Sequence, residues 1–190
     1  ERNFLYISLD RSLNFIPLID KFEASYRFLG GNAETLWFFS NLDAPNGKIL
    51  TLNIADKKFQ WKELIGEKTF PISGASIAGD KLIINYLKDT ISQVEFYNLQ
   101  GKFIKELHYE NIGTLSGFNG RFDSNITYFE FSNFTSPQRI YELDLKSLEY
   151  SLYWETTIKN LNINDYVSKL DFYQSKDGTI WIGSTGEGIY

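Results

Sequence analysis

A repeat of about 45 residues constrains the fold of this chain more than any other feature of its sequence. Three segments align with one another, and Leu36, Leu82 and Thr127 occupy the same place in them. Each segment consists of short apolar runs separated by turn-forming residues, and no long run shows the apolar stripe of a helix. The repeat therefore predicts an all-β protein.

Each repeat has the pattern of four antiparallel strands. The repeats are residues 25–66, 72–109 and 113–155, after a partial unit in residues 1–20. The third strand of each repeat ends in a Leu-Asn, Tyr-Asn or Leu-Asp pair. The reversals Asp43–Gly47 and Asn98–Gly101 contain the Pro, Asn and Gly that tight turns favour.

Four antiparallel strands in such a period are typical of a β-propeller blade, although an ordinary antiparallel sandwich remains open as the alternative. A blade cannot bury both of its faces alone, so blades stack around an axis and share a core. About three and a half blades do not close a ring of four to eight. We therefore predict a partial β-propeller over residues 1–160, followed by a linker and terminal strands over residues 161–190.

The composition excludes several classes of protein. The net charge is −5 and there is no basic block, so a nucleic-acid partner is not expected. No apolar run is long enough to span a bilayer, so no membrane partner is expected either. The absence of Cys excludes disulfides, thiol nucleophiles and thiolate metal sites, and leaves the compartment open between cytoplasm and periplasm.

Two stretches hold residue types that serve in catalysis. His108 is the only His, and its neighbours Glu106 and Glu110 suggest a solvated strand. Ser76 lies in Gly74–Gly79, which resembles a nucleophile elbow but is followed by a turn and a strand instead of a helix. A Ser-His-Asp triad needs a His between nucleophile and acid. We therefore predict no catalytic residue in this chain.

Two further stretches resemble ligand-binding loops. Asn160–Asp165 alternates oxygen ligands like a calcium loop, but Asp165 stands where Gly is required and Asp171 where Glu is required. Gly183–Gly188 has the glycines of a phosphate loop without the following Lys and helix. We predict a turn-rich linker for the first, a hairpin turn for the second, and neither a metal nor a cofactor.

The stretch YFEFSNFTSPQRIYELDL (Tyr128–Leu145) resembles a blade of the propeller of the prolyl oligopeptidase family. Further segments resemble the family in the same order, so that the likeness covers nearly all of residues 1–179. They are Pro17–Phe28, Ser40–Ile54, Trp61–Lys68, Asp80–Leu107 and Asn162–Thr179.

The resemblance implies a seven-bladed propeller that caps an α/β-hydrolase domain in a serine endopeptidase, which cleaves after proline in short peptides. This chain resembles only the later blades, and no position matches the family's catalytic Ser, Asp or His. The chain alone is therefore expected to be a non-catalytic gate and scaffold. Its implied partners are the hydrolase domain and an oligopeptide substrate.

The resemblance also bears on substrate contacts. In some family members an Arg and a Cys on one propeller strand face the substrate, and aligning that strand with Asn3–Leu9 puts Phe4 and Ser8 at those places. Neither matches the family residue. Ser8 is the one candidate for a substrate contact.

After Thr179 the sequence departs from the family. The stretch IWIGSTGEGIY resembles a repeat in the sensor propellers of bacterial hybrid two-component proteins. The alternative function is therefore a non-enzymatic sensor or ligand-binding propeller. In either case open blade faces leave apolar strands and edges unpaired, so we expect the chain to self-associate.

Overall fold

The computed structural model describes residues 2–8, 14–55, 59–156, 158–159, 166–174 and 180–186. These residues form sixteen β-strands and no helix, which confirms the all-β prediction. Accordingly, no helix able to cross a membrane occurs in the described ranges.

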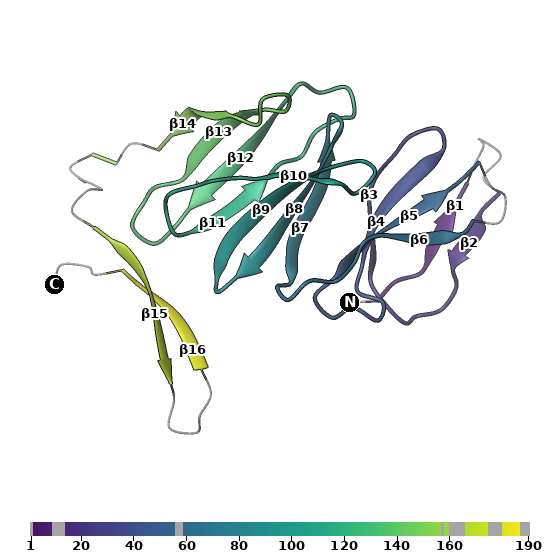
Figure 1. The fold of residues 1–190 in the computed structure, drawn as a ribbon, viewed down its shortest axis with the longest axis horizontal. Helices are drawn as coiled ribbons and strands as arrows, with labels where there is room; N and C mark the ends of the chain where they lie inside the picture. Colours follow the sequence, from purple (N-terminus) through teal and green to yellow (C-terminus); the bar gives the residue numbers. More distant parts are fainter. Residues whose placement is uncertain are drawn as a thin grey trace. The chain divides into compact units, whose positions relative to one another are not determined.

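Three antiparallel sheets have four strands each, arranged in chain order across the sheet (Figure 1). The first sheet consists of β3 (Tyr26–Gly31), β4 (Thr35–Ser40), β5 (Lys48–Asn53) and β6 (Trp61–Ile65). The second consists of β7 (Ile72–Ala78), β8 (Lys81–Lys88), β9 (Ile91–Asn98) and β10 (Phe103–Glu106). The third consists of β11 (Thr114–Gly117), β12 (Ile126–Ser132), β13 (Arg139–Asp144) and β14 (Tyr150–Glu155).

Along the chain, one two-stranded sheet precedes these three sheets and another follows them. The strands β1 (Leu5–Ile7) and β2 (Ile16–Ile19) pair antiparallel, and so do β15 (Ser168–Gln174) and β16 (Ile180–Gly186). The chain divides into two compact units, residues 1–75 and residues 76–190.

The repeat register predicted from the sequence is confirmed. Leu36, Leu82 and Thr127 are each the second residue of the second strand of their sheet. The residue pairs that end each third strand also share a role. The Asn or Asp side chain of each pair accepts backbone N–H groups of the following turn. The acceptors are Asn53, Asn98 and Asp144, with the shortest bonds at 2.9, 2.8 and 2.7 Å.

The core of the second unit follows from strand alternation. Successive side chains point to opposite faces of a strand, so every second residue can face one neighbouring sheet. Ile83, Val94 and Phe96 of the second sheet lie in one buried cluster with Phe129, Phe131 and Leu143 of the third. The two sheets therefore stack face to face, as neighbouring blades do.

The first unit has a buried cluster of its own. Ala24, Tyr26 and Leu50 form a buried cluster, against which Ile19 and Trp61 pack. The side-chain amide of Asn3 makes two hydrogen bonds with the backbone of Tyr26, at 2.9 and 2.7 Å. This bidentate contact ties the segment before β1 to the edge strand β3.

The predicted turn at Gly183–Gly188 is wrong for the part that the structure describes. Gly183 pairs with Asp171 and Gly186 pairs with Ser168, so both glycines lie within β16. The continuous row of partners along β15 outweighs the turn preference of glycine at these positions. Residues 187 and 188 lie outside the described residues.

The β8–β9 hairpin contains a strained turn that yields a stability prediction. Lys88 pairs with Ile91, and between them Asp89 and Thr90 have φ values of 49° and 67°. Both central residues of such a type I′ turn need positive φ, which favours Asp-Gly and disfavours a branched residue. Thr90→Gly is therefore expected to raise the free energy of unfolding by about 1 kcal/mol. Urea unfolding measures it.

The matched control is Thr114→Gly, because Thr114 begins strand β11 and pairs with Ser132, so glycine destabilises there. We expect that variant to unfold at a lower urea concentration than the parent protein. A Thr90→Gly variant that behaves like Thr114→Gly would show that the turn is not of this type.

Candidate functional site

The residues considered for catalysis do not assemble into a triad in the described part of the chain. The Ser76 hydroxyl, on β7, donates to the Phe118 carbonyl oxygen at 2.7 Å, so its bond is to backbone and not to an imidazole. His108 is exposed two residues after β10, along a cavity of about 290 Å³ that Glu106 and Tyr109 also line. Ser76 has a structural partner. That this chain holds no catalytic residue stays a prediction.

The predicted substrate contact lies at the end of the first strand. Ser8 follows β1 directly and is half-buried. Phe4 is exposed, and its ring packs on Phe22 with 5.5 Å between the centroids. Ser8 does not line the cavities described in this subsection. Its contact with substrate stays a prediction.

The calcium-like stretch Asn160–Asp165 lies outside the described residues. In the described ranges, no group of three or more His, Asp or Glu side chains could hold a metal ion.

One carboxylate is buried where the sequence suggests solvent. Glu95 on β9 is 7% exposed and accepts a hydrogen bond from the Tyr97 hydroxyl. Burial, and then this hydrogen bond, raise the pKa of Tyr97, so the phenol stays protonated and donates. The pair is a satisfied polar contact within the strand, and sequence reasoning did not find it.

A second polar pair lies among the aromatic rings of the second unit. The hydroxyl oxygens of Tyr109 and Tyr141 are 2.9 Å apart, and Tyr150 donates to the His108 carbonyl oxygen at 3.2 Å. Burial, and then the bond to Tyr141, raise the pKa of Tyr109. The Tyr109 phenol therefore stays protonated at physiological pH and joins the cluster through its hydrogen bond.

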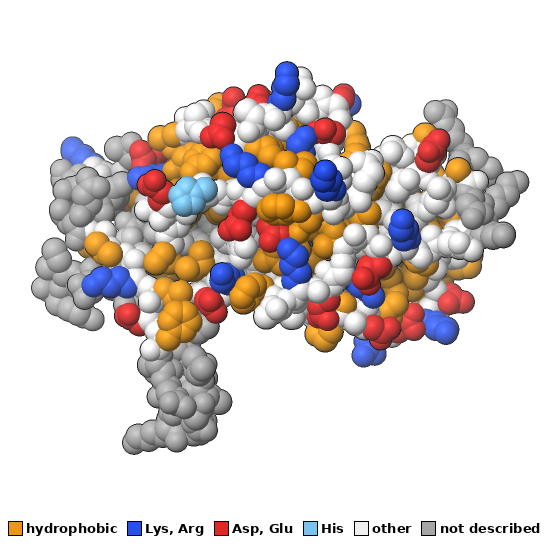
Figure 2. Space-filling model, viewed as in Figure 1, with side chains coloured by type: hydrophobic (Ala, Val, Ile, Leu, Met, Phe, Trp, Pro, Cys, Tyr) orange, Lys and Arg blue, Asp and Glu red, His pale blue; other side chains and the backbone are white. Residues whose placement is uncertain are grey.

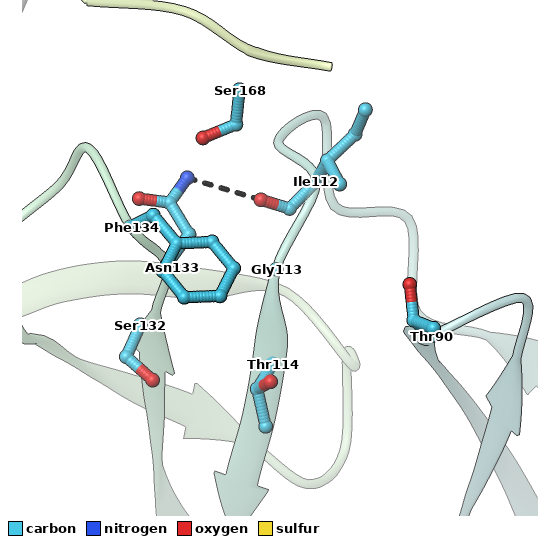
Figure 3. A pocket seen from close by; sticks show the side chains of 8 residues that line it. All are labelled: Thr90, Ile112, Gly113, Thr114, Ser132, Asn133, Phe134 and Ser168. Atoms are coloured by element: carbon cyan, nitrogen blue, oxygen red, sulfur yellow. Dashed lines mark hydrogen bonds between the residues drawn. The ribbon is translucent and has the colours of Figure 1, made fainter. Parts of the chain in front are cut away.

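A cavity of about 470 Å³ lies where the chain enters β11 and leaves β12 (Figure 3). That volume is in the range of small-ligand sites. Its lining is uncharged and combines hydroxyl groups with two large apolar side chains. The lining residues are Thr90, Ile112, Gly113, Thr114, Ser132, Asn133, Phe134 and Ser168.

Asn133 makes several hydrogen bonds along the wall of this cavity. Its Nδ2 donates to the Ile112 carbonyl oxygen at 3.0 Å, the bond drawn in Figure 3. Its Oδ1 accepts the backbone N–H groups of Thr135 and Ser136 at 3.0 and 2.6 Å. These bonds to the backbone make the Asn133 amide a structural tie.

The first sheet contains the counterpart of this tie. Asn41 follows β4 as Asn133 follows β12, and its Oδ1 accepts the Ser25 backbone N–H at 2.7 Å, just before β3 begins. Both asparagines stand in a Phe-Ser-Asn triplet, Phe39–Asn41 and Phe131–Asn133. That repeated triplet is the sequence signal that could have revealed the tie.

The described surface carries both signs of charge. On the face in Figure 2, Lys and Arg are interspersed with Asp and Glu, and hydrophobic side chains reach the surface between them. The described atoms on this face therefore form no basic stripe of the kind that phosphate backbones need.

Comparison with known proteins identifies the family. The family described as the prolyl oligopeptidase N-terminal β-propeller domain matches residues 1–156. The chain belongs to this family. The resemblance seen in Tyr128–Leu145 is thereby confirmed, and the family's propeller accounts for the three four-stranded sheets.

Curated prolyl oligopeptidase relatives match along most of the chain. The prolyl endopeptidase of Elizabethkingia meningoseptica is 31% identical over 179 residues, which cover 93% of this chain and 25% of that protein. The prolyl endopeptidase of Dictyostelium discoideum is 30% identical over 174 residues, covering 85% and 23%. The chain thus spans about a quarter of the length of these relatives.

Solved structures of prolyl oligopeptidases share the fold. One, from work on two prolyl endopeptidases and the role of inter-domain dynamics in their catalysis and specificity, has a TM-score of 0.84 at 26% identity. The match covers 95% of this chain and 27% of the solved chain. The apo prolyl oligopeptidase B of Galerina marginata has a TM-score of 0.85 at 19% identity, covering 95% and 27%, and shows the fold alone. The predicted partial β-propeller is confirmed.

Proposed function

We propose that these residues are the gating and scaffolding part of a prolyl-oligopeptidase-like serine endopeptidase, which cleaves after proline in short peptides. The match of residues 1–156 to the family's N-terminal propeller carries the proposal, because the relatives with that domain are named prolyl endopeptidases. Catalysis is assigned to an α/β-hydrolase domain outside the described residues. The propeller part ends near residue 160, and residues 161–190 form its exit.

Two features of the described residues support a gating role. The second and third sheets are stacked through buried aromatic side chains, so these two sheets form a rigid wall and not a deformable one. The hydroxyl of Ser76 and the amide of Asn133 are bonded to backbone, so neither is offered to a substrate. Ser8, which follows β1, remains the proposed substrate contact.

The isolated chain is therefore expected to give no turnover of a proline-containing chromogenic peptide. The assay uses the purified 190 residues, with the Elizabethkingia meningoseptica prolyl endopeptidase as the positive control. Turnover that persists after contaminating serine proteases are inhibited would contradict the non-catalytic role.

The alternative function is a sensor or ligand-binding propeller without catalysis. It is favoured by one observation, the likeness of Ile180–Tyr190 to a sensor-propeller repeat. The reading frame beyond Tyr190 separates the two functions. A hydrolase domain with a Gly-x-Ser-x-Gly motif supports the endopeptidase, whereas further Trp-Ile-Gly repeats, or a membrane span and a kinase, support the sensor.

The third sheet has an apolar face that supports self-association. Thr127, Phe129 and Phe131 of β12 are buried, so Ile126 and Tyr128 project from the opposite face. Tyr128 meets Tyr153 of β14 edge to face at 4.9 Å. Four large side chains of this region are 40–63% exposed, namely Ile126, Tyr128, Tyr153 and Trp154.

We expect a second copy of the chain to cover this face, because a solvated sheet face is normally polar. Sedimentation velocity should show that the average mass rises with protein concentration. Trp154→Lys should shift the chain towards monomer. The matched control is Phe134→Lys, since Phe134 is 78% exposed in a loop and not on the sheet face. A parent chain that stays monomeric at all concentrations would overturn the expectation.

A further inference from the structure

The cavity wall at β12 continues into a hydrogen-bonded chain that reaches the exit hairpin. The Thr135 hydroxyl oxygen lies 2.9 Å from the Ser168 hydroxyl oxygen and 3.4 Å from Asn133 Oδ1. Ser168 is the first residue of β15 and also lines the cavity (Figure 3). Polar side chains therefore connect the third sheet with the hairpin β15–β16.

The direction of these bonds follows from the chemistry of the groups. Asn133 Oδ1 can only accept, so the Thr135 hydroxyl proton points towards it. The Thr135 oxygen is then left to accept the Ser168 proton. Because Asn133 is fixed by backbone bonds to Ile112 and Ser136, it provides a rigid anchor for the two hydroxyls.

The ties of Asn41 and Asn133 show which hydrogen bonds the first and third sheets have in common. Asn41 binds the entry to β3, and Asn133 binds the entry to β11, so this tie belongs to the sheet itself. The hydroxyl pair is an addition at the third sheet, the last one before the exit hairpin. The strands of a sheet pair with one another without such a hydroxyl pair.

We propose that Thr135 and Ser168 form a latch, which positions the hairpin β15–β16 on the third sheet. The latch residues are positioning residues, since they act through the hairpin and not on a substrate. The latch itself does not depend on the proposed function. If the chain serves an endopeptidase, the latch sets the direction in which the polypeptide leaves the propeller.

The absence of Cys makes the latch directly measurable. Ser151→Cys on β14 and Asp171→Cys on β15 introduce two exposed labelling sites, one on the sheet and one on the hairpin. Spin labels at these sites report the distance between sheet and hairpin by double electron–electron resonance. Dilution with unlabelled chain removes distances between copies.

We expect one dominant distance in the parent chain. Thr135→Val and Ser168→Ala should each lower the ratio of docked to undocked hairpin about 2- to 12-fold, the effect of one lost hydrogen bond. Thr135→Ser, which keeps the hydroxyl, should restore the parent ratio. Ser147→Ala is the control, because that hydroxyl bonds to Asp144 within the β13–β14 turn.

Distances that do not change on Thr135→Val would overturn the latch, and so would a Thr135→Ser variant that behaves like Thr135→Val. A circular dichroism spectrum of each variant shows whether the sheets remain folded. Neither readout involves peptide cleavage, so a failure of the latch is distinguishable from a failure of the proposed function.

Discussion

Replacement of Phe129 by alanine is expected to lower the free energy of unfolding of the second unit by about 3–5 kcal/mol. Phe129 is 1% exposed, and its ring stacks on Phe118 at 4.9 Å and on Tyr141 at 5.1 Å. Because β12 is hydrogen-bonded to β11 and β13, the backbone cannot collapse into the cavity that the ring leaves. Urea unfolding followed by circular dichroism measures the loss.

Two variants control this experiment. Phe134→Ala removes a ring of the same size that is 78% exposed, and it should leave the unfolding midpoint nearly unchanged. Phe129→Leu keeps most of the apolar volume and should lose less than Phe129→Ala. Equal midpoints for Phe129→Ala and Phe134→Ala would mean that the stacked sheets do not form the core described here.

Gly79→Ala is expected to lower the free energy of unfolding by about 2–5 kcal/mol. Both the left-handed backbone conformation and an overpacked contact contribute to this loss. Gly79 has a φ of 56°, and a Cβ there would lie 2.6 Å from the Ser124 carbonyl oxygen. The backbone N–H of Gly79 donates to the Arg121 carbonyl oxygen at 2.8 Å, so the two segments cannot separate without losing that bond. Thermal unfolding should show a lower Tm.

Gly101→Ala is the matched control for this variant. Gly101 has a φ of 81° in the β9–β10 turn, so alanine there meets the same backbone penalty. We expect a smaller loss of Tm than for Gly79→Ala. If both variants lower Tm by the same amount, the contact with Ser124 contributes nothing and only the backbone penalty acts.

The sheet architecture could be predicted because its signals are local. Alternating apolar residues and Asn or Asp at the end of each third strand repeat in every sheet, and each signal acts over a few residues. The turn at Gly183–Gly188 was predicted wrongly for the opposite reason. Gly183 and Gly186 prefer turns locally, but their pairing with β15 is decided by residues far along the chain.

Other features could not be predicted from one sequence. Glu95 lies between the core residues Val94 and Phe96, so alternation assigns it to the opposite face, where a carboxylate suggests solvent. Its burial depends on packing that no local pattern encodes. The contact of Thr135 with Ser168 joins residues 33 positions apart, and hydroxyl pairs of this kind leave no trace in composition or spacing.

One measurement most directly tests the proposal that the chain is the propeller part of a prolyl-oligopeptidase-like endopeptidase. The complete reading frame that contains these 190 residues is expressed and incubated with a short proline-containing peptide, and the products are identified by mass spectrometry. The account predicts cleavage on the carboxyl side of proline, blocked by a serine-directed inhibitor, and no cleavage by the 190 residues alone. A folded full-frame protein that leaves the peptide intact would contradict it.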